Sequence, residues 1–154
     1  MLPQAGAATA DYPPGQQHAG KPPDVRVRQW RRFMRFLVVD DSTTMRRIII
    51  NTLNKLGYQD IVEAGNGREG IDRVGEGPVD LVITDWNMPE MNGIDFIKTL
   101  RAMEGKQQLP VLMVTTNAAK DDIVEALRAG VNNYVVKPFT PDTIKEKIDA
   151  VLAQ

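Results

Sequence analysis

Five polar residues of this 154-residue chain stand at the ends of short apolar runs, where a folded protein would bring them together. Asp40 and Asp41 follow the first run, and Asp85 follows the third. Thr115 and Lys137 follow the fourth and fifth. Carboxylates that lie close together repel one another, so either positive charges must neutralise them or one must stay protonated. Lys137 supplies one positive charge, and a divalent cation would supply two more. Oxygen ligands without histidine or cysteine favour Mg²⁺ over zinc, and Mg²⁺ is often completed by phosphate oxygens. The residues therefore predict a magnesium site that receives a phosphoryl group.

A carboxylate is the predicted nucleophile of this site. The chain has no cysteine, and its one histidine, His18, lies far upstream of the apolar runs. Asp85, flanked by the other acids and by Lys137, can form an acyl phosphate. Phosphatases of the haloacid dehalogenase type also use an aspartate, with a second acid two residues later as proton shuttle. Here that position is Asn87, which cannot shuttle a proton. We expect slow hydrolysis and hence a switch, not a turnover enzyme.

Each of these residues also has a structural interpretation. Asp41 or Ser42 could cap the helix that follows. Thr115 could be an ordinary β-branched strand residue, and Lys137 a surface lysine. The argument for function is their joint placement, because unpaired buried charge is costly.

The elements that must position these residues follow a regular alternation. Five runs that are apolar at nearly every position alternate with five helical patterns, which predicts a (βα)5 α/β fold with a parallel sheet covered on both faces. The carboxyl ends of parallel strands meet at one edge, where ligands bind. The predicted strands are 36–39, 61–64, 79–84, 110–114 and 134–136, and the helical patterns are 45–56, 67–74, 96–103, 123–127 and 144–152.

Residues 1–34 differ in composition from the rest of the chain. They hold five basic and two acidic residues and five of the ten prolines. We expect this segment to be disordered, or an upstream extension with Met34 as the biological start, and we expect the domain to span 35–154. The basic stretch around Trp30 could tether nucleic acid or a membrane surface, but a solvated tail is the favoured interpretation.

Composition excludes several classes of function. The net charge of −1 does not indicate a nucleic-acid binder, and the absence of cysteine excludes disulfides and fits a cytoplasmic location. No apolar run approaches the ~18 residues of a membrane helix, and the amino terminus has no signal-peptide pattern.

Four segments together carry a specific resemblance. They are FLVVDDS-TMRR (36–47, with one threonine in the gap), TDWNMPEMNG (84–93), LPVLMVTT (109–116) and NNYVVKPFT (132–140). The chain from Met34 to Gln154 resembles the receiver domains of two-component response regulators, in particular the single-domain chemotaxis regulators of the CheY type. This resemblance implies a flavodoxin-like, doubly wound sheet in the order 2-1-3-4-5.

The resemblance also implies roles for individual residues. Asp85 would take phosphate from a phosphohistidine of a chemotaxis histidine kinase. Tyr134 would be the switch aromatic, and the peptide bond between Lys137 and Pro138 would be cis. The implied Mg²⁺ ligands are Asp40 (through water), Asp41, Asp85 and the main-chain carbonyl of Asn87, and the implied phosphoryl ligands are Lys137 and Thr115.

The implied partners are the kinase and a flagellar motor switch protein, with a phosphatase as a candidate third partner. We expect a monomer that binds neither nucleic acid nor membrane. The alternative is a stand-alone receiver that acts as a phosphate sink or relay outside motility. Ser42 and Asn117 depart from the best-known enterobacterial pattern beside the phosphoryl pocket, and Thr116 and Ala119 depart from it on the output face.

Overall fold

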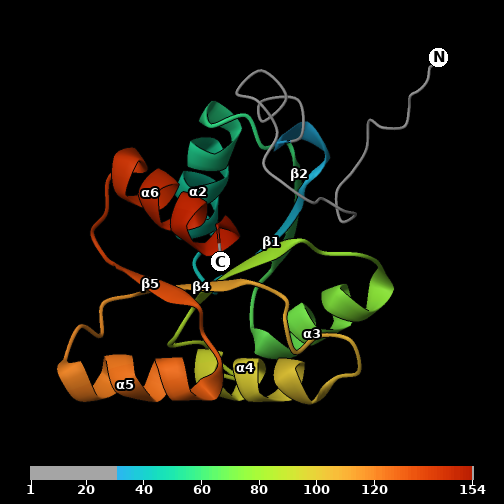
Figure 1. The fold of residues 1–154 in the computed structure, drawn as a ribbon, viewed down its shortest axis with the longest axis vertical. Helices are drawn as coiled ribbons and strands as arrows, with labels where there is room; N and C mark the ends of the chain where they lie inside the picture. Colours follow the sequence, from blue (N-terminus) through green and yellow to red (C-terminus); the bar gives the residue numbers. More distant parts are fainter. Residues whose placement is uncertain (1–30, 154) are drawn as a thin grey trace.

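Five parallel strands form one sheet in the order β2-β1-β3-β4-β5 in the computed structural model, which describes residues 31–153 (Figure 1). This confirms the predicted fold class and strand order. The sheet's carboxyl edge therefore brings together the ends of strands that are far apart in the sequence. The strands are β1 (Arg35–Val39), β2 (Asp60–Ala64), β3 (Leu81–Asp85), β4 (Val111–Thr115) and β5 (Asn133–Val136).

Helices cover both faces of this sheet. Figure 1 shows α2 and α6 on one face and α3, α4 and α5 on the other. None of the helices within residues 31–153 is long and apolar enough to cross a membrane. The helices are α2 (Thr43–Lys55), α3 (Gly67–Glu76), α4 (Gly93–Ala102), α5 (Lys120–Ala129) and α6 (Pro141–Leu152).

The two faces explain why the strand sequences are continuously apolar. In β1, Phe36 and Val38 pack into a core with α2 and α6. Leu37 and Val39 point to the opposite face and join the core formed with α3, α4 and α5. Because successive strand residues alternate between faces and both faces are covered, most positions of the central strands are apolar.

Local signals set the ends of the helices. The Ser42 hydroxyl accepts a hydrogen bond from the Met45 amide (3.1 Å) and caps α2. Thr140 caps α6 in the same way, with Pro141 at the first helical position. At the end of α5, Gly130 adopts the left-handed conformation (φ 116°) that glycine tolerates best.

Two strands end one residue later than the sequence pattern predicts. Asp85 pairs with Val114 and is the last residue of β3, which begins at Leu81 and not at Val79. Thr115 pairs with Val136 and is the last residue of β4. The ladders extend into these polar residues because backbone pairing does not depend on side-chain hydrophobicity.

The described part of the upstream segment contacts the domain. Residues 31–33 are helical, and the Arg31 guanidinium donates to the carbonyl of Leu56 (3.0 Å). The same group lies 5.6 Å from the centre of the Tyr58 ring. Trp30 and the rest of the segment predicted to be disordered lie outside the described residues, so that prediction stays open.

Candidate functional site

Three carboxylates meet at the carboxyl edge of the sheet. Asp40 directly follows β1, Asp41 is its neighbour, and Asp85 ends β3. One oxygen of each carboxylate lies within 4.8 Å of the other two. Asp40 and Asp85 are 1% and 8% exposed, whereas Asp41 is exposed. The fold thus brings together acids that are up to 45 positions apart in the sequence, the distance from Asp40 to Asp85.

Lys137 provides the positive charge of the cluster. Its ammonium lies 3.2 Å from Asp85 Oδ1 and 3.4 Å from Asp40 Oδ2. The side chain is only 16% exposed, so this charge is held among the acids and is not a free surface lysine. The Lys137–Pro138 peptide bond is cis, as the resemblance implies.

Asp85 is electrostatically perturbed. Burial raises the pKa of its carboxyl group above the ordinary value, and the nearby Asp40 raises it further. Lys137 opposes this shift, as does the backbone amide of Trp86, which donates to Asp85 Oδ1 (2.8 Å). Such a group, poised between a neutralising lysine and a repelling acid, is typical of functional sites.

The helix-cap interpretation applies to Ser42 and not to Asp41. Ser42 caps α2, and its amide donates to Asp40 Oδ1 (2.9 Å). Within residues 31–153, no hydrogen bond or ion pair holds the Asp41 carboxylate. Asp41 therefore has oxygens available for a ligand.

Thr115 and Asn87 lie at the same edge but are not bonded to the acids. The buried Thr115 hydroxyl accepts a hydrogen bond from the Asn117 amide (2.9 Å). The exposed Asn87 side chain donates to the side chain of Asn117 (3.4 Å), which links the loops after β3 and β4. Sequence patterns do not reveal this bond, because the partners are 30 residues apart.

Tyr134 lies farther along β5. Its side chain is half-buried, and the Lys147 ammonium lies 5.5 Å from the ring centre. Tyr134 also packs against the hydrophobic core that α3, α4 and α5 cover. The lysine on α6 and the tyrosine on β5 form a cation–π pair.

Two glycines allow close backbone approaches near the site, one to Asp85 and one to the loop after β3. A Cβ on Gly93 would collide with the carbonyl of Asp85. A Cβ on Gly67 would lie 2.6 Å from the carbonyl of Met91, to which the Gly67 amide donates (3.1 Å). For Gly67 the available signal in the sequence was its position at a predicted helix start, whereas Gly93 precedes the predicted helical pattern 96–103 and begins α4 in the structure.

The donor set fits Mg²⁺. Three carboxylates from two strand ends converge, one of them has no competing partner among the described residues, and no nitrogen or sulfur ligand is present in the cluster. Hard divalent cations prefer such oxygen sites. The arrangement also places an ammonium beside the central acid, which suits binding of an anionic group.

Comparison with known proteins agrees with this geometry. The sequence pattern of the response regulator receiver domain matches residues 36–149. The chain is 52% identical over 120 residues to chemotaxis protein CheY1 of Helicobacter pylori, covering 77% of this chain and 97% of that protein. It is 53% identical over 120 residues to a CheY homolog of Campylobacter jejuni, covering 77% and 92%.

Solved structures show the same relationship. The chemotaxis response regulator CheY4 of Vibrio cholerae superposes with a TM-score of 0.72 at 33% identity, covering 77% of this chain and 98% of that chain. The sequence match, the strand order and the edge of acids point to one family. The chain belongs to the response regulator receiver domain family, and its relatives include CheY chemotaxis proteins.

Proposed function

We propose that Asp85 accepts a phosphoryl group from a phosphohistidine of a chemotaxis histidine kinase, and that the phosphorylated domain signals to a flagellar motor switch protein. The observation that carries the proposal is the Asp85 carboxylate itself, which lies between Lys137 (3.2 Å) and the two other acids. The names of the relatives support the chemotaxis role.

The two oxygens of Asp85 have different surroundings. Oδ1 accepts hydrogen bonds from the Trp86 amide and interacts with Lys137, whereas Oδ2 has no donor within residues 31–153. In the proposed step Oδ2 attacks phosphorus. A new O–P bond forms, the N–P bond to an imidazole already protonated on its other ring nitrogen breaks, and neutral imidazole leaves. The product is an acyl phosphate on Asp85.

The acids would hold Mg²⁺ during this step. Asp40, Asp41, Asp85 and the main-chain carbonyl of Asn87 are the proposed ligands. When bound, the ion neutralises the carboxylates and the incoming phosphoryl group. The Lys137 ammonium lies beside the same carboxylates and adds a further positive charge to the site.

The switch is proposed to run through Thr115 and Tyr134. Phosphorylation adds about −1.5 to −2 charges and three acceptor oxygens. The Thr115 hydroxyl, now bonded to Asn117, would turn to these oxygens and shift the loop after β4. Tyr134 would then move inward and bias the surface of α5, β5 and α6 toward its binding state.

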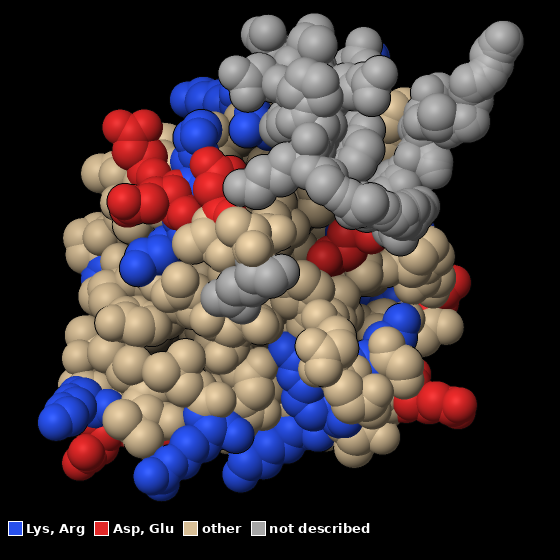
Figure 2. All heavy atoms as spheres, in the orientation of Figure 1, with Lys and Arg blue, Asp and Glu red and all other residues tan. Residues whose placement is uncertain are grey.

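The proposed output surface has features that suit a protein partner. Figure 2 shows a largely uncharged band over β5, between the acidic residues near α6 and the basic residues near α5. Leu127 of α5 and Val136 of β5 are 46% and 37% exposed. We propose that these exposed apolar side chains contribute to the surface that the partner binds.

The protein is proposed to act by stoichiometric self-phosphorylation and slow self-dephosphorylation, not as an enzyme. Asn87 occupies the place where an acid would be needed to activate water, and an amide does not transfer that proton. A phosphatase is a candidate partner for resetting the switch. We further propose a monomer that works in the cytoplasm with its kinase.

The phosphorylation step can be tested by intact-mass analysis. The chain is incubated with acetyl phosphate in Mg²⁺ or in excess chelator. We expect one added phosphoryl group in Mg²⁺ only, and none for Asp85→Asn. Asp72→Asn, which removes an exposed acid of α3, serves as the control and should be phosphorylated normally. Unchanged labelling of Asp85→Asn would refute the assignment.

The output can be tested by binding to a purified motor switch protein, with and without beryllofluoride as a phosphoryl mimic. We expect binding to strengthen with the mimic. If the mimic has no effect on this partner although Asp85 is phosphorylated, the alternative of a phosphate sink or relay outside motility is favoured.

A further inference from the structure

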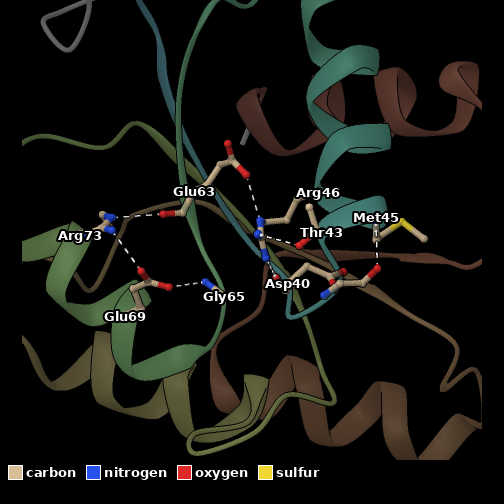
Figure 3. A network of polar contacts seen from close by, with 9 residues as sticks. Asp40, Thr43, Met45, Arg46, Glu63, Gly65, Glu69 and Arg73 are labelled. Atoms are coloured by element: carbon tan, nitrogen blue, oxygen red, sulfur yellow. Dashed lines mark hydrogen bonds and ion pairs between the residues drawn. The ribbon is translucent and has the colours of Figure 1, made fainter.

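Arg46, on the first turn of α2, uses its guanidinium to join three parts of the fold. Nη1 donates to the main-chain carbonyl of Asp40 (2.5 Å), Nη2 to the Thr43 hydroxyl (3.3 Å), and Nε to Glu63 of β2 (2.9 Å) (Figure 3). The side chain is only 17% exposed. The planar fork of an arginine can satisfy such divergent acceptors, whereas a lysine ammonium cannot.

The bonded carbonyl belongs to the peptide that joins Asp40 to Asp41. The Asp40 side chain has its own restraints, because its Oδ1 accepts from the Ser42 amide and its Oδ2 faces Lys137. The Asp41 carboxylate has no hydrogen bond or ion pair within residues 31–153. Its direction is therefore set by the backbone, and Arg46 is the side chain that holds the carbonyl of the preceding peptide.

The guanidinium is itself firmly anchored. Glu63 balances its charge, and the Glu63 carbonyl accepts a hydrogen bond from Arg73 of α3 (3.1 Å). Arg73 also pairs with Glu69 (3.1 Å), which accepts from the Gly65 amide. Figure 3 shows these contacts as one continuous network from the end of β1 to α3. Arg46 thus connects the Asp40 carbonyl to β2 through hydrogen bonds.

We propose that Arg46 is a positioning residue for divalent cation binding, which it supports by fixing the Asp40–Asp41 peptide so that Asp41 is directed toward Asp40 and Asp85. The inference rests on the proposed function, in which these acids hold Mg²⁺. Charge alone would act in the opposite direction, because a guanidinium near the site repels a cation. Removing Arg46 therefore weakens Mg²⁺ binding if it positions Asp41 and strengthens binding if only its charge matters.

The experiment is a titration of the full chain with MgCl₂. Trp86 is adjacent to Asp85 and 8% exposed, so its fluorescence can report the bound ion. The chain has two tryptophans, and Trp30→Phe in all samples leaves Trp86 as the sole indole. The thermal unfolding midpoint is measured over the same Mg²⁺ series as an independent readout, because ligand binding to the folded state raises it.

The variants are Arg46→Met, Arg46→Lys and the control Arg47→Met. Arg47 carries the same charge on the same helix, but it is exposed and makes no hydrogen bond or ion pair within residues 31–153. We expect Arg46→Met to raise the Kd for Mg²⁺ about tenfold or more, as loss of partners behind metal ligands does. Arg46→Lys should give an intermediate Kd, and Arg47→Met a Kd within about twofold of the parent, since exposed charges are screened.

The inference is overturned if Arg46→Met binds Mg²⁺ with the same Kd as the parent or with a lower one. This holds even if the variant unfolds more easily in chelator. If Arg46→Met does not fold, Arg46→Lys decides in the same way, and a Kd equal to that of the parent counts against positioning. If the parent itself binds no Mg²⁺, the metal site of the proposed function fails together with the inference.

Discussion

Replacing Asp85 by asparagine should stabilise the metal-free protein and destabilise it relative to the parent in Mg²⁺. Asp85 Oδ1 lies 3.2 Å from the Lys137 ammonium, and its carboxylate is within 4.8 Å of both Asp40 and Asp41. At an effective dielectric constant of 20, the attraction is about 5 kcal/mol and each repulsion about 3.5 kcal/mol. The two repulsions together exceed the attraction, but water screens the exposed Asp41 and so reduces this difference. Burial of Asp85 adds to the cost of its negative charge.

The net effect of the substitution in chelator is an increase of about 1 kcal/mol in the free energy of unfolding, or about 4 °C in Tm for a domain of this size. In Mg²⁺ the parent becomes more stable than Asp85→Asn. At a concentration 100 times the parent's Kd, the ion stabilises the parent by about 2.7 kcal/mol. A variant that binds tenfold more weakly, because one ligand is now an amide, gains only about 1.4 kcal/mol.

The pH dependence follows from the direction of the pKa shift. The pKa of Asp85 is raised above its ordinary value of 3.8, chiefly by burial, so the folded state releases this proton at higher pH than the unfolded chain does. The metal-free parent therefore loses stability as pH rises from 3.8 through the raised pKa. The advantage of the variant should be complete above that pKa and absent below pH 3.8, where the parent is protonated.

The assay is thermal unfolding by circular dichroism across pH, in chelator and in Mg²⁺, with Asp72→Asn as the control for loss of an exposed charge. A lower Tm for Asp85→Asn in chelator at neutral pH would refute the electrostatic reasoning. The same holds if its advantage persists undiminished at low pH.

Three further predictions concern the neighbours of Asp85. Lys137→Met should raise the pKa of Asp85 further, because Lys137 lowers it. Phosphorylation from acetyl phosphate should continue in this variant, but it should no longer change the affinity for the partner. A normal change in affinity would contradict this role of Lys137. Thr115→Val keeps the shape of a buried strand residue but removes its hydroxyl, so phosphorylation should persist in mass analysis while binding to the motor switch protein no longer responds to it. Gly93→Ala should lower the Tm, since its methyl group would collide with the Asp85 carbonyl. Gly75→Ala, at a position of α3 where a methyl group meets no neighbour, should raise stability by up to about 1 kcal/mol. Equal effects of the two substitutions would contradict the close approach at Gly93.

The amino-acid pattern alone was sufficient to predict a parallel sheet and the edge at which the acids meet, whereas the strand order came from the resemblance to receiver domains. Strands covered on both faces are apolar at nearly every position, which is why 36–39 and 110–114 could be identified as β-strands from the sequence pattern. Asp40 and Asp85 interrupt that pattern at the ends of strands, and parallel topology requires those ends to meet. Helix stops such as Gly130 depend on local backbone preferences, so they too are visible in the sequence.

Contacts between distant loops depended on the tertiary structure. The sequence left open whether Asp41 or Ser42 caps α2, and only the geometry of the first turn assigns the cap to Ser42. Two hydrogen bonds depend on side-chain directions and on distances between separate loops. They are the bond from Asn87 to Asn117 and the bond from Arg46 to the Asp40 carbonyl. Local sequence determines which residues reach the edge of the sheet, but the packing of helices and loops around it determines which of their atoms touch.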